Sequence, residues 1–461
     1  MKPPEYRYQA FARQKIQSRG KTALLAPPGA GKTRPIIEGV FSRIAPHEAI
    51  LIICSGPAVA TWKRQIPLWL DDTSIADEIH YVSGSALDRR AILASAKHGG
   101  IFIMNAAVFR IDFPTIQGIS WAAVIADEYH KFMIRRKSQT YEKFLKLTRH
   151  IPNTVICTGS GVRRNPSSMF TAFQIIDPIV FRGYWKFVNT YCLVSDGAYG
   201  KEIIGVKNQA QLQQRMDHYM AYIPEEVVAD QQPKGKRQSL DVEMDEQQEK
   251  IYEDLTKHML SITDEGGVLV ASTVLGKLIM LRQLLCCPKI LDENLGLGAG
   301  FEAVVDKLDE DPHVAIFVPF RPAVGYFVDE LRRRGYYAEG LLGGTSPQEL
   351  QRIIDDLRRK EGVLVCTIQY AESFDFETCK TSYFIGYDYT VDQNQQAEGR
   401  TKRAISEHKF VTWNYIKYMN TIDEYLLLKL DEDFRNMRRV LSRPQELIDF
   451  LRGITNVDQN N

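Results

Sequence analysis

The chain has 461 residues, of which 44% are hydrophobic and 25% are charged, and 58 Lys and Arg residues offset 57 Asp and Glu residues to leave a net charge of +1. This length accommodates two or three domains, and the composition is typical of a globular protein. The charge balance excludes a uniformly basic coat protein but is compatible with a local basic groove. Because apolar runs stay well short of 18 residues and the N-terminal MKPPEYRYQA is polar, we expect no membrane span and no secretory signal. The seven cysteines form no CxxC pair and no zinc-like group with histidine, which favours reduced, buried thiols and no structural metal.

Short apolar runs in the first half of the chain alternate with amphipathic stretches. Each run is expected to form a buried strand bounded by turns, with helices between the strands. This alternation is typical of a parallel sheet that carries helices on both faces. The runs are residues 22–26, 49–54, 100–104, 121–126 and 153–158.

The same alternation returns late in the chain, at residues 313–318, 337–341, 362–367 and 381–387. The predicted fold class is therefore α/β, with two tandem domains built on parallel sheets. Between the two domains, residues 170–225 and 243–290 have mainly helical patterns.

We place the first domain at residues 1–236, with a helical insertion at 170–225. The second domain is placed at 237–461, with a helical protrusion at 243–295 and a C-terminal helix at 431–453. The segment ADQQPKGKRQSL (229–240) contains Pro and Gly and is predicted to be a linker.

The stretch APPGAGKT (26–33) follows the first predicted strand and precedes a helical pattern. A glycine-bearing turn that enters a helix presents backbone N–H groups to a phosphate at the positive end of the helix. In such a turn Lys32 can reach the β- and γ-phosphates, and the Thr33 hydroxyl can ligate Mg²⁺. We predict an ATP-binding loop made of Pro28, Gly29, Ala30, Gly31, Lys32, Thr33 and Arg34.

Two adjacent acids, Asp127 and Glu128, follow the apolar run 121–126. At the end of a strand, Asp127 can hold Mg²⁺ through water, and Glu128 can orient and deprotonate the attacking water. Such a pair is weak on its own, because many adjacent acids lie in solvated loops. Together with APPGAGKT it predicts a site of Mg-ATP hydrolysis in which Lys32, Asp127 and Glu128 are catalytic.

A third polar motif, QQAEGRTKRA (395–404), lies in the second domain. Its residues Gln396, Arg400 and Arg403 are spaced i, i+4 and i+7, which places them on one face of a helix. A solvated, salt-bridged surface helix would have the same spacing.

Taken in order, these motifs resemble those of the superfamily-two helicases and, within them, the Swi/Snf-type DNA translocase ATPases. The resemblance extends over nearly the whole chain, with departures at Tyr129, Ser160, Ser373 and Tyr389. The stretches that carry it are YRYQ (6–9), APPGAGKT, LIICSGPAVATWKRQIPLW (51–69), DEYH (127–130), VICTGSGVRRNPSSMFTAFQIIDP (155–178), HVAIFVPFR (313–321), VLVCTIQYAESFDF (363–376) and QQAEGRTKR.

The resemblance implies two tandem RecA-like lobes, with ATP bound between them. It implies that Gln9 reads adenine, that Arg400 and Arg403 contact the γ-phosphate, and that Gln396 links the site to the DEYH motif or to bound water. Residues implied to couple the nucleotide to motion are His130, Thr158, Ser160 and Asp375. Residues implied to contact the nucleic-acid backbone are Ser55, Gly56, Lys63, Arg64, Asn105, Arg321 and Thr367. Three basic clusters, residues 135–137, 163–164 and 332–334, either extend that surface or form solvated faces.

The leading expectation is an ATP-dependent translocase on double-stranded DNA that uses ATP and Mg²⁺ and contacts the backbone without reading sequence. Such an enzyme would work in the cytoplasm of a bacterial or phage-infected cell, or wherever its DNA resides, and would not be secreted. The alternative is a strand-separating, annealing or branch-migrating helicase of the same superfamily. A more distant alternative is a P-loop switch protein that binds ATP and partners without motor work. The sequence identifies no protein partner.

Overall fold

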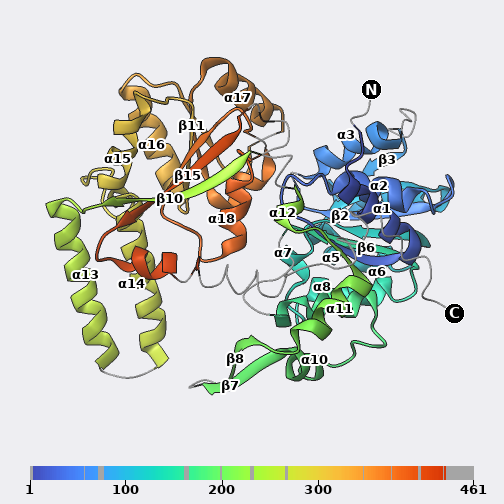
Figure 1. The fold of residues 1–461 in the computed structure, drawn as a ribbon. Helices are drawn as coiled ribbons and strands as arrows, with labels where there is room; N and C mark the ends of the chain where they lie inside the picture. Colours follow the sequence, from blue (N-terminus) through green and yellow to red (C-terminus); the bar gives the residue numbers. More distant parts are fainter. Residues whose placement is uncertain are drawn as a thin grey trace. The chain divides into compact units, whose positions relative to one another are not determined.

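The computed structural model describes residues 4–56, 58–70, 77–159, 166–197, 200–228, 233–264, 268–345, 347–374, 376–402, 406, 408–428 and 430–431. The chain divides into two compact units, residues 1–230 and residues 231–432, each built around its own parallel sheet (Figure 1). Within the described ranges, no helix combines the length and the apolar character needed to cross a bilayer. The predicted α/β class with two tandem parallel sheets is confirmed.

The first unit contains a seven-stranded parallel sheet with the order β3-β4-β2-β5-β6-β1-β9. All five strands expected in this half of the chain are present, and β2, β5 and β6 match the predicted runs residue for residue. Two three-residue strands, β3 and β9, were not predicted. The strands are β1 (Lys21–Leu25), β2 (Ala49–Cys54), β3 (Ile79–Tyr81), β4 (Gly100–Asn105), β5 (Trp121–Ala126), β6 (Asn153–Thr158) and β9 (Met220–Tyr222).

Helices cover both faces of this sheet, because the strands bury apolar side chains on both sides. Along β1, for example, Leu24 packs into one buried cluster, and Ala23 and Leu25 pack into the other. The first cluster includes α1 (Arg7–Arg19), α2 (Thr33–Phe41) and α3 (Ala58–Leu70). The second includes α4 (Ala86–Ala94), α5 (Ala106–Ile111), α6 (Phe113–Ile116), α8 (Gln139–Thr148), α9 (Phe170–Ile176), α10 (Tyr184–Tyr191) and α11 (Gln209–Tyr219). Two short helices, α7 (His130–Met133) and α12 (Glu225–Val228), complete the unit.

The prediction of a helical insertion over residues 170–225 needs correction. Alongside α9, α10 and α11, this stretch contains an antiparallel hairpin, β7 (Cys192–Gly197) and β8 (Gly200–Val206), as well as strand β9. Strand β9 pairs with β1 and extends the central sheet. Strands this short leave little periodic signal in the sequence, and their pairing partner decides whether they form.

The second unit contains a six-stranded parallel sheet with the order β10-β15-β14-β11-β13-β12. The four runs expected here all form strands. The strands are β10 (Lys234–Val242), β11 (Val314–Val318), β12 (Ala338–Leu341), β13 (Val363–Thr367), β14 (Thr381–Ile385) and β15 (Phe410–Tyr418).

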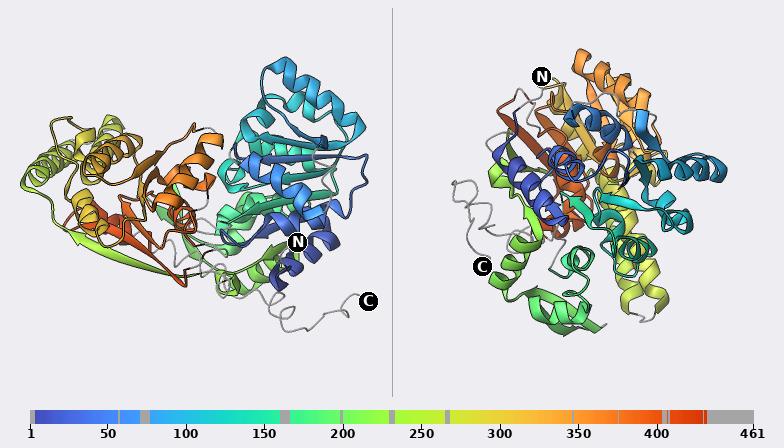
Figure 2. Two further views of the ribbon diagram at one scale, coloured as in Figure 1. Left: turned by 90° about the horizontal axis from the view of Figure 1, so that it is seen from above. Right: turned by 90° about the vertical axis from the view of Figure 1, so that its right-hand side faces the viewer.

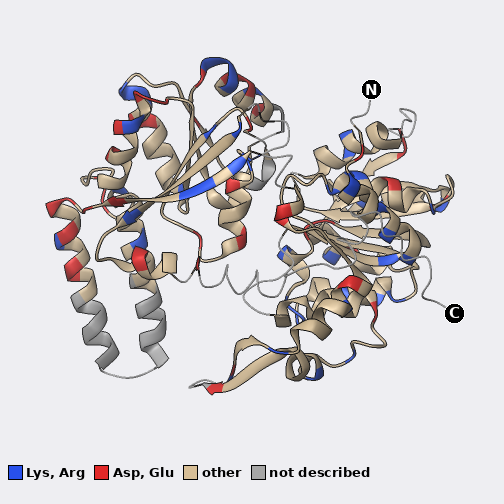
Figure 3. Cartoon of the chain, viewed as in Figure 1, with Lys and Arg blue, Asp and Glu red and all other residues tan. Residues whose placement is uncertain are grey.

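The predicted linker at residues 229–240 is wrong over most of its length, because Lys234–Val242 is an edge strand. It pairs with β15 over all nine residues. The strand is largely exposed and its first half is basic, with Lys234, Lys236 and Arg237 (Figure 3), so it lacks the apolar pattern of a buried strand. The two units divide between residues 230 and 231, whereas the boundary predicted after residue 236 would cut this strand.

Helices also cover both faces of the second sheet, a layering that Figure 2 shows from two further sides. One buried cluster contains the end of α14 (Val268–Cys286) together with α15 (Ala299–Leu308) and α16 (Arg321–Arg333). The opposite cluster contains α17 (Pro347–Lys360) and α18 (Val391–Glu398). Helices α13 (Glu246–Asp264) and α14 form the expected helical pair within residues 243–295. The helix predicted at 431–453 lies, beyond Asp431, outside the described residues.

Candidate functional site

The loop between β1 and α2 has the shape of a phosphate cradle. Gly29 and Gly31 have φ angles of 78° and 68°, in the region that favours glycine. A Cβ at Gly31 would lie 2.5 Å from Nε2 of Gln9, so a side chain there would displace the end of the Gln9 side chain. Helix α2 begins at Thr33, so the N–H groups of its first turn and its positive dipole end face the loop.

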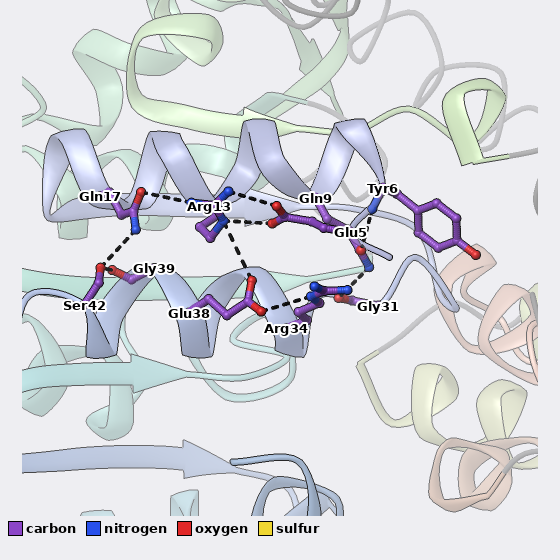
Figure 4. A network of polar contacts seen from close by, with 10 residues as sticks. All are labelled: Glu5, Tyr6, Gln9, Arg13, Gln17, Gly31, Arg34, Glu38, Gly39 and Ser42. Carbon is purple, nitrogen blue, oxygen red and sulfur yellow. Dashed lines mark hydrogen bonds and ion pairs between the residues drawn. The ribbon is translucent and has the colours of Figure 1, made fainter. Parts of the chain in front are cut away.

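Gln9 on α1 holds this loop through hydrogen bonds to its backbone (Figure 4). Its Nε2 donates to the carbonyl oxygens of Ala30 at 3.2 Å and Gly31 at 3.4 Å. Its Oε1 accepts from the backbone N–H of Tyr6 at 3.2 Å. Gln9 therefore contacts the residues expected to hold phosphate, and adenine recognition by this side chain stays a proposal.

Lys32 lies at the centre of the candidate site. Its Nζ donates to the carbonyl oxygen of Ala26 at 3.2 Å and lies 3.5 Å from Oε1 of Glu128. The structure thus brings together two of the predicted catalytic residues, one from the loop after β1 and one from the turn after β5.

Glu128 is held by three neighbours. Its Oε2 accepts from the backbone N–H of Gly159 at 3.1 Å and lies 3.2 Å from Nδ1 of His130. Burial by itself raises the pKa of this carboxyl. The ammonium of Lys32 and the hydrogen bond to His130 outweigh that effect, so the pKa of Glu128 lies well below its ordinary value. Glu128 is therefore ionised at neutral pH. Its φ of 46° is unusual for a non-glycine residue and aims the side chain at the site.

His130 and Thr158, two of the residues implied to couple nucleotide to motion, contact each other. Nδ1 of His130 lies 2.6 Å from the Thr158 hydroxyl, and both side chains are fully buried. Thr158 ends β6, and its carbonyl oxygen accepts from the backbone N–H of Ala26 at the start of the phosphate loop. The contacts therefore connect the loop, the end of β6 and Glu128 in one network. The other two coupling residues, Ser160 and Asp375, lie outside the described residues.

Asp127 is positioned by side chains that the sequence prediction did not connect with it. The Trp62 indole N–H on α3 donates to Oδ2 at 2.9 Å, and the Cys157 thiol on β6 donates to Oδ1 at 3.1 Å. Burial, together with the nearby Asp127 and Glu128, raises the pKa of Cys157 well above its ordinary value, so the thiol keeps the proton that it donates. The sequence indicates Trp62 only as part of a motif, and the register between β5 and β6 that places Cys157 beside Asp127 leaves no local signal.

The residues expected to hold Mg²⁺ fit that ion chemically. Mg²⁺ prefers oxygen ligands and keeps several of its waters. Thr33 supplies a hydroxyl at the start of α2, and each oxygen of Asp127 accepts one of the hydrogen bonds described above. A carboxylate oxygen has two lone pairs, so both oxygens keep acceptor capacity.

Arg34, predicted to be part of the ATP loop, is the second residue of α2 and contacts side chains of α2 and α3. Its Nε donates to Oε1 of Glu38 at 3.1 Å, and its guanidinium lies 4.6 Å from the centre of the Trp69 ring. Glu38 also lies 3.7 Å from Arg13 of α1, which forms two hydrogen bonds with Glu5 (Figure 4). This network joins α1 to α2 and fixes the helix that carries Gln9.

In the second unit, the helix predicted to carry Gln396 and Arg400 on one face ends before Arg400. Helix α18 ends at Glu398, and Gly399 and Arg400 form a closing turn. Arg400 lies in that turn, where Nε donates to the carbonyl oxygen of Gln396 and Nη1 to that of Phe374, both at 3.0 Å. Gln396 itself is buried on α18, and Arg403 lies outside the described residues.

The turn that carries Arg400 is anchored to the sheet on both sides. Glu398 accepts two hydrogen bonds from Arg237 of β10, at 2.5 and 2.6 Å, and one from the Tyr415 hydroxyl at 2.8 Å. The Trp413 indole donates to the Thr401 hydroxyl at 3.1 Å. The position of Arg400 therefore depends on the strand pair β10–β15.

Three of the candidate nucleic-acid contacts of the first unit lie at the carboxyl ends of neighbouring strands. Ser55 and Gly56 follow β2, and Asn105 ends β4, where it is paired with Cys54. Asn105 caps α5, because its Oδ1 accepts from the backbone N–H groups of Ala107 and Val108. Its acceptor is therefore occupied, and its amide N–H groups are what it can offer to a phosphate. On α3, the side chains of Lys63 and Arg64 are exposed.

The second unit places Arg321 and Thr367 at the corresponding edge of its sheet. Thr367 ends β13 and pairs with Val318 at the end of β11. Arg321 is exposed at the first position of α16, three residues beyond β11. Thr367 is 8% exposed, so little of its side chain is accessible.

The basic clusters differ in their pairing. Arg332, Arg333 and Arg334 form ion pairs with Glu339, Glu330 and Glu302, and acidic and basic residues lie beside one another on α16 (Figure 3). This cluster is thus a salt-bridged face. Residues 163–164 lie outside the described residues, and residues 135–137 are considered below.

Known proteins similar to this chain were found by sequence and by structure. The family model described as "SNF2-related domain" matches residues 10–290, and the one described as "Helicase conserved C-terminal domain" matches residues 299–405. The CHD3-type chromatin-remodeling factor CHR7 of Arabidopsis thaliana is 21% identical over 90% of this chain and 35% of its own length. Chromodomain-helicase-DNA-binding protein 8 of Homo sapiens is 22% identical over 88% of this chain and 17% of its own length.

The chain thus spans about a third or less of these curated relatives. Among solved structures, the SWI2/SNF2 ATPase core of Sulfolobus solfataricus in complex with dsDNA has a TM-score of 0.43 and 14% identity, covering 94% of this chain and 95% of that one. The SNF2-related model alone matches more than half of the residues. The chain therefore belongs to the SNF2-related family of helicase-like ATPases and carries a helicase C-terminal domain after its SNF2-related domain.

Proposed function

We propose that this chain is a DNA-dependent ATPase motor that translocates along double-stranded DNA. The observation that carries the proposal is the meeting of Lys32 and Glu128 at 3.5 Å, with Asp127 held beside them, at one edge of a parallel sheet in a SNF2-related chain.

In this proposal, the backbone N–H groups of residues 29–33 and the Lys32 ammonium bind and orient the phosphates of ATP. Thr33 and Asp127 would hold Mg²⁺, which when bound neutralises charge on the β- and γ-phosphate oxygens. Glu128 orients the attacking water and accepts its proton. Gln9 would contact adenine while it supports the loop.

Arg400, together with Arg403, would stabilise the charge that develops on the γ-phosphate. Such an arginine contributes roughly 10³–10⁵ in rate to phosphoryl transfer. Because Lys32 belongs to the first unit and Arg400 to the second, hydrolysis would require the two units to close around the nucleotide. The His130–Thr158 contact would transmit the state of the nucleotide from Glu128 to β6.

DNA would be held through its phosphates, since residues at strand ends and helix starts commonly contact the backbone without reading bases. The candidates are Ser55, Gly56, Lys63, Arg64 and Asn105 in the first unit, and Arg321 and Thr367 in the second. The names of two relatives, a chromatin-remodeling factor and a helicase-DNA-binding protein, agree with DNA as the partner.

An ATPase assay that compares duplex, single-stranded and forked DNA with RNA tests this function. We expect duplex DNA to stimulate turnover most, and the enzyme to displace a third strand from a triplex without separating a fork. Fork separation would favour a strand-separating helicase of the same superfamily. An ATPase rate unchanged by every nucleic acid would favour an ATP-dependent switch protein.

A further inference from the structure

A second pocket lies within the first unit, apart from the phosphate loop. Its volume is about 390 Å³. One wall is the loop that follows α7, with Arg135, Arg136 and Lys137. The other wall is formed by Ser167 and Ser168 on a 3₁₀ turn, and by Tyr184 at the start of α10.

The basic wall of this pocket differs from the arginine cluster at residues 332–334 in its ion pairing. Among the described residues, none of Arg135, Arg136 and Lys137 forms an ion pair, and the described lining contains no carboxylate. All three side chains are exposed. This differs from Arg332, Arg333 and Arg334, each of which is neutralised by glutamate. Three unpaired cations at one concave surface favour an anionic ligand.

The other lining residues supply hydroxyl groups and an aromatic surface. The hydroxyl of Thr171, a further lining residue, is buried and has no hydrogen-bond partner among the described residues. The Arg136 guanidinium lies 4.5 Å from the centre of the Tyr184 ring, which packs edge-on against Phe170 at 5.4 Å. Beside Tyr184, the ring of Trp185 is 51% exposed. The stacking on Tyr184 holds Arg136 at the pocket, so less side-chain freedom is lost when it binds.

We propose that this pocket binds a phosphate group of a nucleic-acid backbone. Guanidinium, ammonium and hydroxyl groups are the side-chain donors that proteins use for DNA phosphates, and a phosphodiester offers only acceptors in return. The inference rests on the proposed function and adds to it a contact site made of residues 135–137 and the wall opposite, distinct from the residues at the strand ends.

The test is duplex DNA binding by the variant R135Q/R136Q/K137Q over a range of salt concentrations. The dependence of log K on log salt has a slope of about −0.9 for each phosphate neutralised. We expect the triple variant to bind duplex DNA at least about tenfold more weakly at low salt. Its slope should be shallower by the amount expected for the loss of about one to two phosphate contacts. The variant R333Q/R352Q/R359Q removes the same charge from exposed, ion-paired arginines and should bind as the unaltered protein does.

Two further measurements make every result decisive. Binding of an ATP analogue without DNA should be unchanged in the triple variant, which shows that it is folded. If the triple variant fails to fold, the single variant K137E replaces it, because Lys137 is exposed. We expect K137E to lose DNA affinity in the same way but to a smaller degree. DNA binding by either folded variant with the affinity and salt slope of the unaltered protein would overturn the pocket while leaving the motor function intact.

A competition experiment with inorganic phosphate distinguishes a nucleic-acid phosphate from a free anion as the ligand of this pocket. At constant ionic strength, phosphate should weaken DNA binding by the unaltered protein more than by the triple variant. If phosphate binds the pocket but the triple variant binds DNA normally, the site takes a free anion and the nucleic-acid assignment is wrong. If the unaltered protein binds no nucleic acid and its ATPase rate does not respond to any, the proposed function and this inference both fall.

Discussion

The carboxylate of Asp127 is held in place by two donors that come from different elements, the Trp62 indole and the Cys157 thiol. Side chains that orient a metal-binding carboxylate typically change metal affinity or activity 10- to 100-fold when they are removed. Replacing Trp62 by Phe keeps the ring in its buried site but removes the N–H donor.

For the variant W62F we expect the Mg²⁺ concentration that gives half-maximal ATPase activity to rise roughly 10-fold or more, because Asp127 loses one of its two orienting bonds. A magnesium titration of the steady-state rate measures this. The matched control is W69F, since the Trp69 indole donates to Gln65 on its own helix. Equal magnesium requirements in W62F and the unaltered protein would contradict the orienting role.

Asp423 is a buried acid whose protonation should affect stability. Burial raises its pKa to about 7, against opposing effects of a backbone hydrogen bond at Tyr418 and of Arg282. Its Oδ2 is buried and has no hydrogen-bond partner in the described part of the chain. Between the unfolded pKa of 3.8 and the folded value of about 7, the folded state binds more protons than the unfolded state. The free energy of unfolding therefore falls as pH rises through this window.

We expect the variant D423N to match the unaltered protein near pH 4 and to exceed it in stability at pH 8, by up to about 4 kcal/mol. Urea unfolding at the two pH values measures the difference. D241N is a suitable control, because Asp241 is exposed and paired with Lys417, which lowers its pKa. A stability gain in D423N that is the same at both pH values would show that Asp423 is ionised throughout.

At the scale of single residues, the candidate catalytic group was predictable where its signal is local. Lys32 and Thr33 follow from one loop, and Asp127 and Glu128 from one strand end. The contacts that Trp62, Cys157 and Gly159 make with those acids depend on strand register and helix placement. Such contacts join residues far apart in the chain and leave no pattern in either segment.

Helix α18 and strand β10 show what decides the end of an element. Residues 395–404 have helical spacing, yet the helix stops at Glu398, where Arg237 and Tyr415 bind the glutamate and the chain turns at Gly399. Strand β10 contains Gly235 and follows Pro233, which is typical of a linker, yet it forms because β15 offers it a full edge to pair with. In both cases tertiary partners override the local preference, which is why the sequence misplaced these boundaries.

Gly235 in β10 provides a prediction for this part of the second unit. A Cβ at this position would overlap the ring of Trp413, whose indole binds Thr401 beside Arg400. We expect G235A to destabilise the second unit by about 1–3 kcal/mol, because the strand pair must shift to admit the methyl group. The control G325A adds a methyl in open space on α16 and should stabilise by about 0.5–1 kcal/mol. Thermal unfolding compares them, and equal transition temperatures for G235A and G325A would contradict the close packing.

Over the whole molecule, the candidate groups divide between the two units. The phosphate loop, Asp127 and Glu128 belong to the first, and Arg400 belongs to the second. The alternation of apolar runs was enough to predict two parallel sheets, because buried strands of such sheets are nearly continuous in apolar residues. The short strands β3 and β9 and the β7–β8 hairpin lack that signal.

This division predicts different kinetic losses for the two units. K32A should lose nucleotide binding, whereas R400A should bind ATP normally and hydrolyse it roughly 10³-fold or more slowly. R400A should also lose a little stability, since Arg400 donates to two carbonyl oxygens. A nucleotide-binding isotherm and a single-turnover rate separate the effects, with R352A, altered on the surface of α17, as control. Normal turnover in R400A would end its assignment to the γ-phosphate.

The ion pair between Lys32 and Glu128 has a consequence for the order of events at the site. While the Lys32 ammonium faces Glu128, it keeps the pKa of the carboxyl low, so the carboxylate is a weak base. A phosphate group that enters the loop competes for the same ammonium, and as Lys32 turns to it, Glu128 loses the neighbour that most lowers its pKa. In the proposed mechanism, a bound phosphate would thereby strengthen Glu128 as the base that acts on the attacking water. Until a phosphate is bound, Glu128 would remain a weak base.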